Sequence, residues 1–265
     1  MTGRVALVTG AARGIGAATT AALAAAGWSV LAVDRAADDP ALPYPMATPA
    51  DLSEVVARAG QGDPDRVQPF TADVRDLAAL EAAVATAETR WGGLDAAIAA
   101  AGVIAGGVPL WELPAEQQQA VLDTDLGGVL NLARAAVPAL LRRPVPRSGR
   151  FLAVASAAAT RGLPMLAAYC AAKAGVTGLI RALAAELAGS GVTANAVSPG
   201  STDTPILAQS ARLYGLPGGA DFARQQPLGR LLDPAEIAAV LAFLASPASS
   251  AMTGSCVPVD GGLAL

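Results

Sequence analysis

Seven short apolar segments, alternating with alanine-rich helical stretches, constrain the fold of this chain more than any other feature. Segments such as RVALV, SVLAV and RFLAVAS are continuously apolar, a pattern typical of parallel strands covered by helices on both faces. This alternation predicts a doubly wound α/β fold, with a parallel sheet of about seven strands in one domain over residues 1–265. The predicted strands lie near 4–10, 29–34, 67–73, 94–100, 150–156, 193–198 and 256–259, and the predicted helices near 14–26, 51–60, 77–91, 115–142, 166–189 and 234–246.

Composition argues against several classes of function. A net charge of −4 with interspersed signs disfavours a nucleic-acid partner, which usually needs a basic face. The chain has no histidine and only two cysteines, Cys170 and Cys256, so we expect no structural zinc site, His-based triad or disulfide framework. The sequence contains no apolar run long enough for a membrane span and no signal-like N-terminus. We therefore predict a cytoplasmic protein without a membrane partner.

A glycine-rich turn joins the first predicted strand to the first predicted helix. In VTGAARGIGAA, Gly10 would permit the tight turn, Gly14 the approach of a pyrophosphate, and Gly16 close packing of helix on strand. The free N–H groups and partial positive charge of the helix N-terminus favour an anion there. An ordinary glycine turn is the alternative. The strand before the turn and the helix after it are the context that a dinucleotide site requires.

The second predicted strand ends in an acidic residue, Asp34. A carboxylate at this point can bind both ribose hydroxyls of NAD and would repel the 2′-phosphate of NADP, so we predict NAD. Arg13 and Arg35 argue weakly the other way, because arginine can hold that phosphate. Capping of the following loop is the alternative role for Asp34.

A tyrosine and a lysine lie four residues apart in YCAAKAG. Tyr169 and Lys173 would share one helix face, and Ser156 closes a predicted strand upstream. A neighbouring ammonium and a positive nicotinamide ring would favour the phenolate and lower the tyrosine pKa, while a serine hydroxyl can orient the substrate oxygen. Lys173 is the sole lysine among 18 basic residues. This usage favours a position that needs a compact ammonium over a solvated surface position.

These motifs resemble the short-chain dehydrogenase/reductase family, whose glycine pattern is T-G-x-x-x-G-I-G. The resemblance implies a Rossmann-type fold in which Tyr169 is the acid/base, Lys173 tunes it and binds ribose, and Ser156 orients the substrate. It extends to VDGG at 259–262, similar to the family's last strand and turn. The residues assigned to the cofactor are Gly10, Arg13, Gly14, Ile15, Gly16, Asp34, Arg35, Asp73, Val74, Ala100, Gly102, Tyr169, Lys173, Pro199, Thr202 and Thr204, with no metal ligand.

Two segments depart from the family pattern. The usual N-N-A-G after the fourth strand reads AAAG at 99–102; the first asparagine normally braces the sheet, so local stability is in question. The fourth catalytic residue, usually asparagine, is Asp125 in DLGG. An ionised aspartate accepts hydrogen bonds but does not donate them. Asp125 could hold a relay water or be protonated, and the alternative is a polar residue inside a helix without a role.

The stretch near 36–66 is longer than its counterpart in the family, and DDPALPYPMATPADL at 38–52 contains four prolines. Proline lowers the entropy lost on ordering, so this segment is either a variable surface loop or a stiff lid beside the adenosine end of the cofactor. Together with VASAAATRGLPMLAAYCAAKAG and VSPGSTDTPILAQSARLYGL, it resembles the mycofactocin-associated dehydrogenases. That resemblance implies a lid over a non-exchanging NAD whose electrons leave through mycofactocin, a peptide-derived redox cofactor.

We therefore expect an oxidoreductase that transfers a hydride between an alcohol or carbonyl substrate and a tightly held NAD. An ordinary NAD-exchanging dehydrogenase and a non-catalytic NAD-binding scaffold are the alternatives. The lobe near 201–231 should cover the substrate, and its apolar side chains predict a small or medium apolar secondary alcohol, unless they form the lobe core or subunit contacts. These side chains are Leu207, Leu213, Tyr214, Leu216 and Phe222, together with Trp111. Family resemblance also implies a homotetramer.

Overall fold

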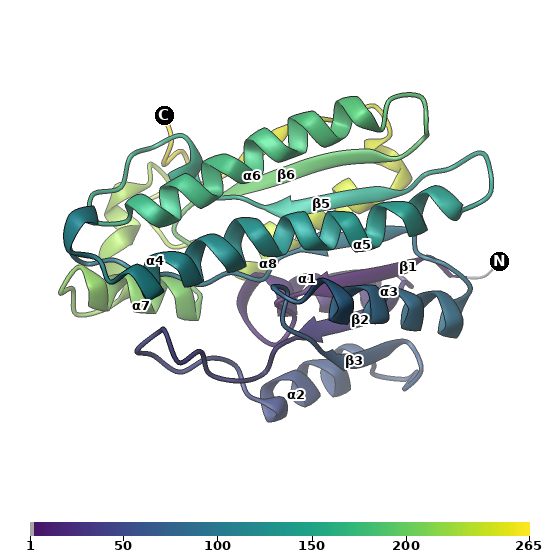
Figure 1. The fold of residues 1–265 in the computed structure, drawn as a ribbon, viewed down its shortest axis with the longest axis horizontal. Helices are drawn as coiled ribbons and strands as arrows, with labels where there is room; N and C mark the ends of the chain where they lie inside the picture. The colour runs from purple at the N-terminus through teal and green to yellow at the C-terminus, as the bar shows by residue number, and fades with distance from the viewer. Residues whose placement is uncertain (1–2) are drawn as a thin grey trace.

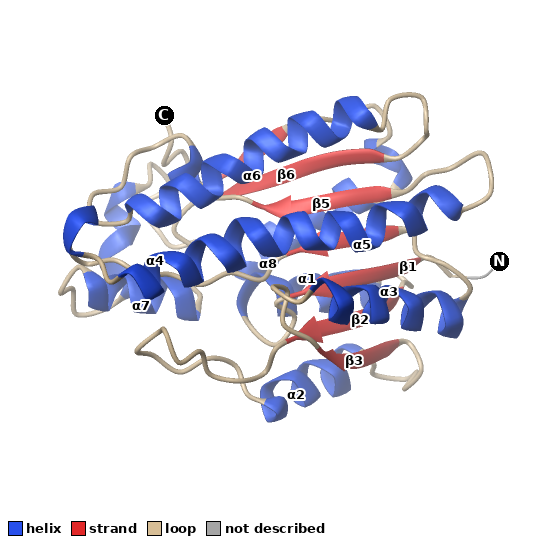
Figure 2. Ribbon diagram, viewed as in Figure 1, coloured by secondary structure: helices blue, strands red, loops and turns tan. Residues whose placement is uncertain are grey.

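The computed structural model describes residues 3–265 and contains a seven-stranded parallel sheet (Figures 1 and 2). The strand order is β3-β2-β1-β4-β5-β6-β7, so the order reverses between β1 and β4, as it does in doubly wound folds. The predicted fold class is therefore confirmed. The strands are β1 Val5–Thr9, β2 Ser29–Asp34, β3 Val67–Thr71, β4 Ala96–Ala99, β5 Arg150–Val154, β6 Thr193–Pro199 and β7 Cys256–Val259.

Helices cover both faces of this sheet and bury two separate apolar clusters. Helices α3, α5 and α6 pack on one face, and α1, α2 and α8 pack on the other. Successive residues of β1 point to opposite faces, so Leu7 joins the first cluster and Val8 the second. This two-sided burial explains the continuous apolar runs. The helices are α1 Gly14–Ala25, α2 Pro49–Ala59, α3 Leu77–Trp91, α4 Ala115–Leu122, α5 Gly128–Arg142, α6 Ala167–Glu186, α7 Pro205–Leu213 and α8 Pro234–Ala245.

The helix predicted over 115–142 is interrupted in the structure. A π-helical turn at Asp123–Gly127 separates α4 from α5 and brings Asp125 to a fully buried position. There the Asp125 Oδ1 atom accepts a hydrogen bond of 2.8 Å from the Val103 N–H group, in the segment after β4. Such π turns inside helices are frequent at functional sites because they redirect one side chain. The periodicity of the sequence could not reveal this break, since the partner of Asp125 lies on a distant segment.

The proline-rich segment divides into a loop and the start of a helix. Residues 38–48, here called the flap, leave the end of β2 and run toward α4 before returning to α2 (Figure 1). Pro49 is the first residue of α2, which Thr48 caps through a reciprocal hydrogen-bonded box with Asp51. Leu52 is buried in the core. Replacing 38–52 by a linker would therefore also remove a helix start, so the separable element is shorter than the sequence indicated.

Candidate active site

A cavity of about 670 Å³ is lined by residues that follow β1, β2, β4, β5 and β6, at the reversal point of the sheet. Residues 72–74 after β3 line it as well. Its position and size are those of ligand sites in doubly wound folds. All residues that the sequence assigned to the cofactor line this cavity, and Ser156 lines it too. These cofactor candidates are Gly10, Arg13, Gly14, Ile15, Gly16, Asp34, Arg35, Asp73, Val74, Ala100, Gly102, Tyr169, Lys173, Pro199, Thr202 and Thr204. The fourth catalytic candidate, Asp125, lies behind this wall.

The glycine turn has a backbone that larger residues could not reproduce. Gly10 has a φ of +67°, and a Cβ atom there would lie 2.6 Å from the backbone of Ala101. A Cβ atom on Gly16 would overlap the Gly10 carbonyl oxygen, so strand and helix approach as closely as predicted. Arg13 is the N-cap of α1 without a side-chain cap bond, and the first turn of α1 has no acidic residue. The N-terminal N–H groups of α1 therefore remain available to a pyrophosphate.

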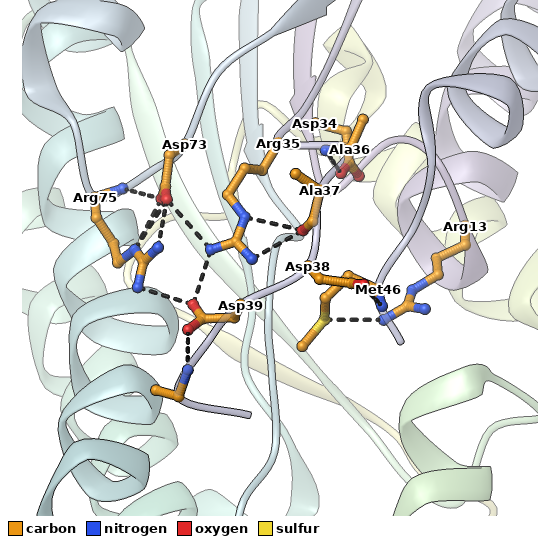
Figure 3. Close-up of polar contacts among 11 residues, drawn as sticks. Arg13, Asp34, Arg35, Ala36, Ala37, Asp38, Asp39, Met46, Asp73 and Arg75 are labelled. Atoms are coloured by element: carbon orange, nitrogen blue, oxygen red, sulfur yellow. Dashed lines mark hydrogen bonds and ion pairs between the residues drawn. The ribbon is translucent and has the colours of Figure 1, made fainter. Parts of the chain in front are cut away.

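Asp34 lies at the end of β2 with its carboxylate partly engaged (Figure 3). One oxygen accepts the Ala12 N–H group at 3.0 Å, and the other accepts the Ala36 N–H group at 2.9 Å. A carboxylate has about four acceptor sites, so two remain for ribose hydroxyls. The bonds to the glycine turn and to the following loop fix the orientation of this carboxylate in the cavity.

The two arginines that could hold a 2′-phosphate are both fastened to other groups. Arg13 donates to the Pro45 carbonyl oxygen at 3.3 Å and contacts the sulfur of Met46 at 3.5 Å, both in the flap. Arg35 forms an ion pair of 2.8 Å with Asp39 and donates to the Ala37 carbonyl oxygen. Both guanidinium groups therefore connect the cofactor cavity to the flap.

Asp39 is the centre of an ion-pair network at the base of the flap (Figure 3). Its side chain is almost fully buried and lies 2.8 Å from Arg35 and 2.9 Å from Arg75. Burial opposes its charge, but the Ala41 N–H group and the two arginines outweigh burial and lower the pKa of Asp39. Asp73 joins this network through an ion pair of 2.6 Å with Arg75. The sequence assigned Asp73 to the cofactor but gave no signal for Asp39, whose partners are Arg35 just before the flap, Ala41 within it and the distant Arg75.

The flap reaches beyond the adenosine end and docks near the catalytic candidates. Leu42 is only 5% exposed and packs in an apolar cluster with residues of α4 and α6, and Tyr44 and Tyr169 pack against the same cluster. The Tyr44 hydroxyl oxygen accepts a hydrogen bond of 2.9 Å from the Ile104 N–H group. Burial raises the pKa of Tyr44 to about 12, so this contact involves the neutral phenol at physiological pH. The flap thus spans the groove instead of bordering it.

Ser156, Tyr169 and Lys173 come together at the catalytic end of the cavity. Tyr169 and Lys173 lie on one face of α6, with the ammonium nitrogen 5.6 Å from the centre of the phenol ring. Lys173 is buried and donates to the Val154 carbonyl oxygen at 3.1 Å. Ser156 follows β5 and accepts the Ala158 N–H group at 3.1 Å, which caps a short 3₁₀ turn. Tyr169 and Lys173 therefore share α6, while the bonds of Lys173 and Ser156 fix these two side chains at the end of β5.

Asp125 pairs directly with Lys173. Its Oδ2 atom lies 3.2 Å from the ammonium nitrogen, at ion-pair distance but without hydrogen-bond alignment. Burial raises the pKa of Asp125, and the Lys173 ammonium opposes this rise. Burial also disfavours the ammonium, but the Asp125 carboxylate outweighs it, so the pKa of Lys173 lies above its ordinary value. Asp125 is therefore more than an isolated polar residue inside a helix, because it contacts both Lys173 and the segment after β4.

The pKa of Tyr169 differs from the sequence-based expectation. Burial raises it, and the nearby Asp125 carboxylate adds to the rise, while the Lys173 ammonium acts in the opposite direction. The sequence pattern predicted only the lowering by lysine and by a nicotinamide ring. Burial is therefore the main reason why the lysine does not bring the pKa of the phenol below its ordinary value, and the carboxylate of Asp125 adds to this effect.

The AAAG segment at 99–102 is braced by a different residue from the asparagine of the family pattern. The Thr9 hydroxyl oxygen accepts the N–H groups of Ala100 and Ala101 at 3.2 and 3.4 Å. It also donates to the Ile98 carbonyl oxygen at 3.4 Å. Thr9 therefore ties β1 to the end of β4, and the local support that alanine cannot give comes from the neighbouring strand.

The substrate lobe contains most of the apolar side chains predicted for the pocket. Four of them line the cavity, and Tyr214 is held by a 2.7 Å hydrogen bond to the Pro164 carbonyl oxygen. Leu213 and Trp111 do not line it, and the Trp111 side chain is 83% exposed. Hydrophobicity alone could not separate these two from the others. The four lining residues are Leu207, Tyr214, Leu216 and Phe222.

Comparison with known proteins identifies the family. Residues 10–264 match the family described as Enoyl-(Acyl carrier protein) reductase. The chain is 39% identical to cis-4-hydroxycyclohexanecarboxylate dehydrogenase of Sinomonas cyclohexanicum, covering 98% of this chain and 96% of that protein. It is 36% identical to 2-dehydro-3-deoxy-L-rhamnonate dehydrogenase (NAD(+)) of Sphingomonas sp. (strain SKA58), covering 98% and 95%. Carveol dehydrogenase from Mycobacterium avium in complex with NAD superposes with a TM-score of 0.92 at 34% identity, covering 99% and 98%.

This chain belongs to the short-chain dehydrogenase/reductase family. It is a nicotinamide-dependent oxidoreductase that acts on alcohol or ketone substrates. The non-catalytic scaffold, one of the alternatives from the sequence, is accordingly set aside. Among residues 3–265, no helix has the length and apolarity needed to cross a membrane. In the same part of the chain, no group of three or more potential ligands could hold a metal ion.

Proposed function

We propose that this enzyme oxidises an alcohol, or reduces the matching carbonyl, with an NAD that stays bound between turnovers and is reoxidised by mycofactocin. The observation that carries the proposal is the flap, which is fastened on both sides of the cofactor groove. The Arg35–Asp39–Arg75 ion pairs hold its base, while Leu42 packs against α4 and α6. The mycofactocin part rests on a resemblance to the mycofactocin-associated dehydrogenases. The flap, the segment from Ser156 to Lys173 and the segment after β6 carry this resemblance.

The cavity fits a dinucleotide at several points. The closely packed glycine turn and the uncapped N-terminus of α1 suit a pyrophosphate, and Asp34 has acceptor sites for ribose hydroxyls. When bound there, NAD would supply the hydride acceptor or donor. We assign Pro199, Thr202 and Thr204 to the nicotinamide end, as the family resemblance implies.

The catalytic roles follow from the chemistry of the side chains. Tyr169 would take up the proton of the alcohol during oxidation and return it during reduction, and Ser156 would hold the substrate oxygen by a hydrogen bond. Lys173 would stabilise the phenolate electrostatically and bind ribose. Asp125 would keep Lys173 charged and in place, since the two groups form a buried ion pair.

The choice of NAD over NADP is supported by charge and by the engagement of the arginines. Asp34 places a carboxylate where NADP carries its 2′-phosphate. Arg35 is paired with Asp39, so its charge is already compensated, and Arg13 is directed to the Pro45 carbonyl oxygen of the flap. The Asp34 carboxylate would repel a dianionic group beside it.

We propose a secondary alcohol on an apolar ring as the substrate class. The cavity lining includes Leu207, Leu216 and Phe222 of the substrate lobe, which offer apolar contact to a substrate. Two of the similar dehydrogenases are named for alcohols on a six-membered carbon ring, cis-4-hydroxycyclohexanecarboxylate and carveol. Such a ring matches the apolar lining better than an open polyol does.

The alternative is an ordinary dehydrogenase that exchanges NAD at every turnover. Release of the nucleotide from purified protein by denaturation, followed by its identification and quantification, decides between the two. We expect NAD close to one per chain, and turnover with an artificial electron acceptor but little with free NAD alone. Retention through purification requires a dissociation rate of about 10⁻⁴ s⁻¹ and hence a Kd of about 0.1 nM at ordinary association rates. Protein that purifies empty and cycles free NAD would support the alternative.

A further inference from the structure

Gln226 lies in the substrate lobe and is nearly as buried as a core residue, with 2% of its surface exposed. It does not line the cavity, and no sequence motif pointed to it. Its amide contacts the segment that follows β6, which contains the proposed nicotinamide ligands Thr202 and Thr204. A buried amide needs partners for one acceptor and two donors, so the identity of those partners shows what this side chain holds.

The Gln226 amide is paired on both sides with the backbone of Ser201. Its Oε1 atom accepts the Ser201 N–H group at 2.8 Å, and its Nε2 atom donates to the Ser201 carbonyl oxygen at 3.2 Å. The same Nε2 atom donates to the Arg230 carbonyl oxygen at 2.7 Å. All donors of this amide are therefore used, and the side chain acts as a clamp between residue 201 and the end of the lobe.

The neighbouring glycine shows how closely this clamp approaches the backbone. A Cβ atom on Gly200 would overlap the Gln226 Oε1 atom. The main chain at 200–201 can therefore adopt this position only because residue 200 lacks a side chain. Thr202 continues the arrangement, since it forms a β-bridge with Leu232. The Gly200 N–H group also donates to the Val259 carbonyl oxygen of β7 at 3.1 Å, so the segment after β6 is held by the lobe and by the sheet at once.

We propose that Gln226 is a positioning residue for the nicotinamide half of the cofactor, and that it couples this half to the substrate lobe. The inference rests on the proposed assignment of Thr202 and Thr204 to the nicotinamide end. Because Gln226 fixes Ser201 from both sides, losing its amide frees the backbone directly before these ligands. The adenosine half is held by Gly10 and Asp34 on other elements, so it should not respond.

The test compares the affinities of two nucleotides for protein freed of its bound nucleotide: NAD, and ADP-ribose, which lacks only the nicotinamide. Gln226→Met keeps the approximate volume and removes all three hydrogen bonds. We expect affinity for NAD to fall by about tenfold or more, from the loss of several buried hydrogen bonds. Affinity for ADP-ribose should change less than twofold. A matched control is Gln209→Met, because Gln209 is also buried in the lobe, but among residues 3–265 its side chain forms a hydrogen bond with Arg212 alone.

The outcomes separate this inference from the proposed function. Equal losses for NAD and ADP-ribose in Gln226→Met would indicate general damage and overturn the positioning role, as would no loss for either nucleotide. If Gln209→Met changes the ratio of the NAD affinity to the ADP-ribose affinity as much as Gln226→Met does, the positioning role is overturned as well. If the unmodified protein itself binds both nucleotides equally well, the assignment of the nicotinamide end fails, whatever Gln226 does. Thermal unfolding of both variants shows whether each remains folded.

Discussion

Leu42 offers a direct way to measure how much the flap contributes to cofactor retention. Its side chain is 5% exposed and packs against α4 and α6, across the groove from the base of the flap. Truncation of a buried leucine to alanine costs about 2–5 kcal/mol in a rigid core. On a loop that can relax, the lower end of about 2 kcal/mol is the appropriate figure. If NAD leaves only after the flap opens, this loss increases the open population and the release rate about 30-fold.

The assay is exchange of labelled NAD. Leu42→Ala and unmodified protein are loaded with labelled NAD and diluted into a large excess of unlabelled NAD, and the label still bound is measured over time. The matched control is Leu52→Ala, because Leu52 is equally buried but packs in the core under α2, outside the flap. Leu52→Ala should lower the melting temperature without accelerating release.

The release rates of the two leucine variants decide whether the flap controls NAD retention. If both release NAD at the same rate, the flap does not control retention, and general loss of stability explains any change. If unmodified protein already exchanges its label within seconds, the flap is not a barrier, and the NAD-exchanging alternative takes its place. Only faster release specific to Leu42→Ala supports the retention mechanism.

Three further predictions concern the polar residues of the site. Tyr169→Phe should lower turnover with an artificial acceptor at least ~100-fold. Lys173→Arg should be similarly damaging because the buried site fits a compact ammonium. Steady-state rates check both, and an active Lys173→Arg enzyme would contradict the role of the lysine. Asp34→Ala should weaken NAD binding and reduce discrimination against NADP, as measured by titration with both nucleotides; NADP in unmodified protein would refute the assignment. Asp125 raises the pKa of Tyr169, so Asp125→Asn should lower that pKa and move the rising limb of the pH–rate profile for alcohol oxidation to lower pH. Asp125→Leu, which also loses the acceptor for the Val103 N–H group, should lose most activity; unchanged profiles in both variants would show that Asp125 has no influence on the reaction.

The sequence by itself determined the elements and the chemical groups of the site. The bounds predicted for β2 and α3 agree with the structure, because burial on both faces of a sheet and helix capping leave local marks in the chain. Those of β7, a partly exposed edge strand, agree as well. The residues predicted to bind the cofactor also meet at one cavity. This follows because the carboxyl ends of parallel strands lie at one edge of the sheet, so motifs after successive strands converge there.

Tertiary structure alone decided the contacts between segments that are far apart in the chain. The break between α4 and α5 places Asp125 against Val103. The flap brings Leu42 and Tyr44 to partners that follow β4 or lie on α4 and α6. The same holds for the clamp of Gln226 on Ser201. A buried polar group or a docking leucine reveals in the sequence that it needs a partner, but not which one. Only the path of the chain in space brings that partner within reach.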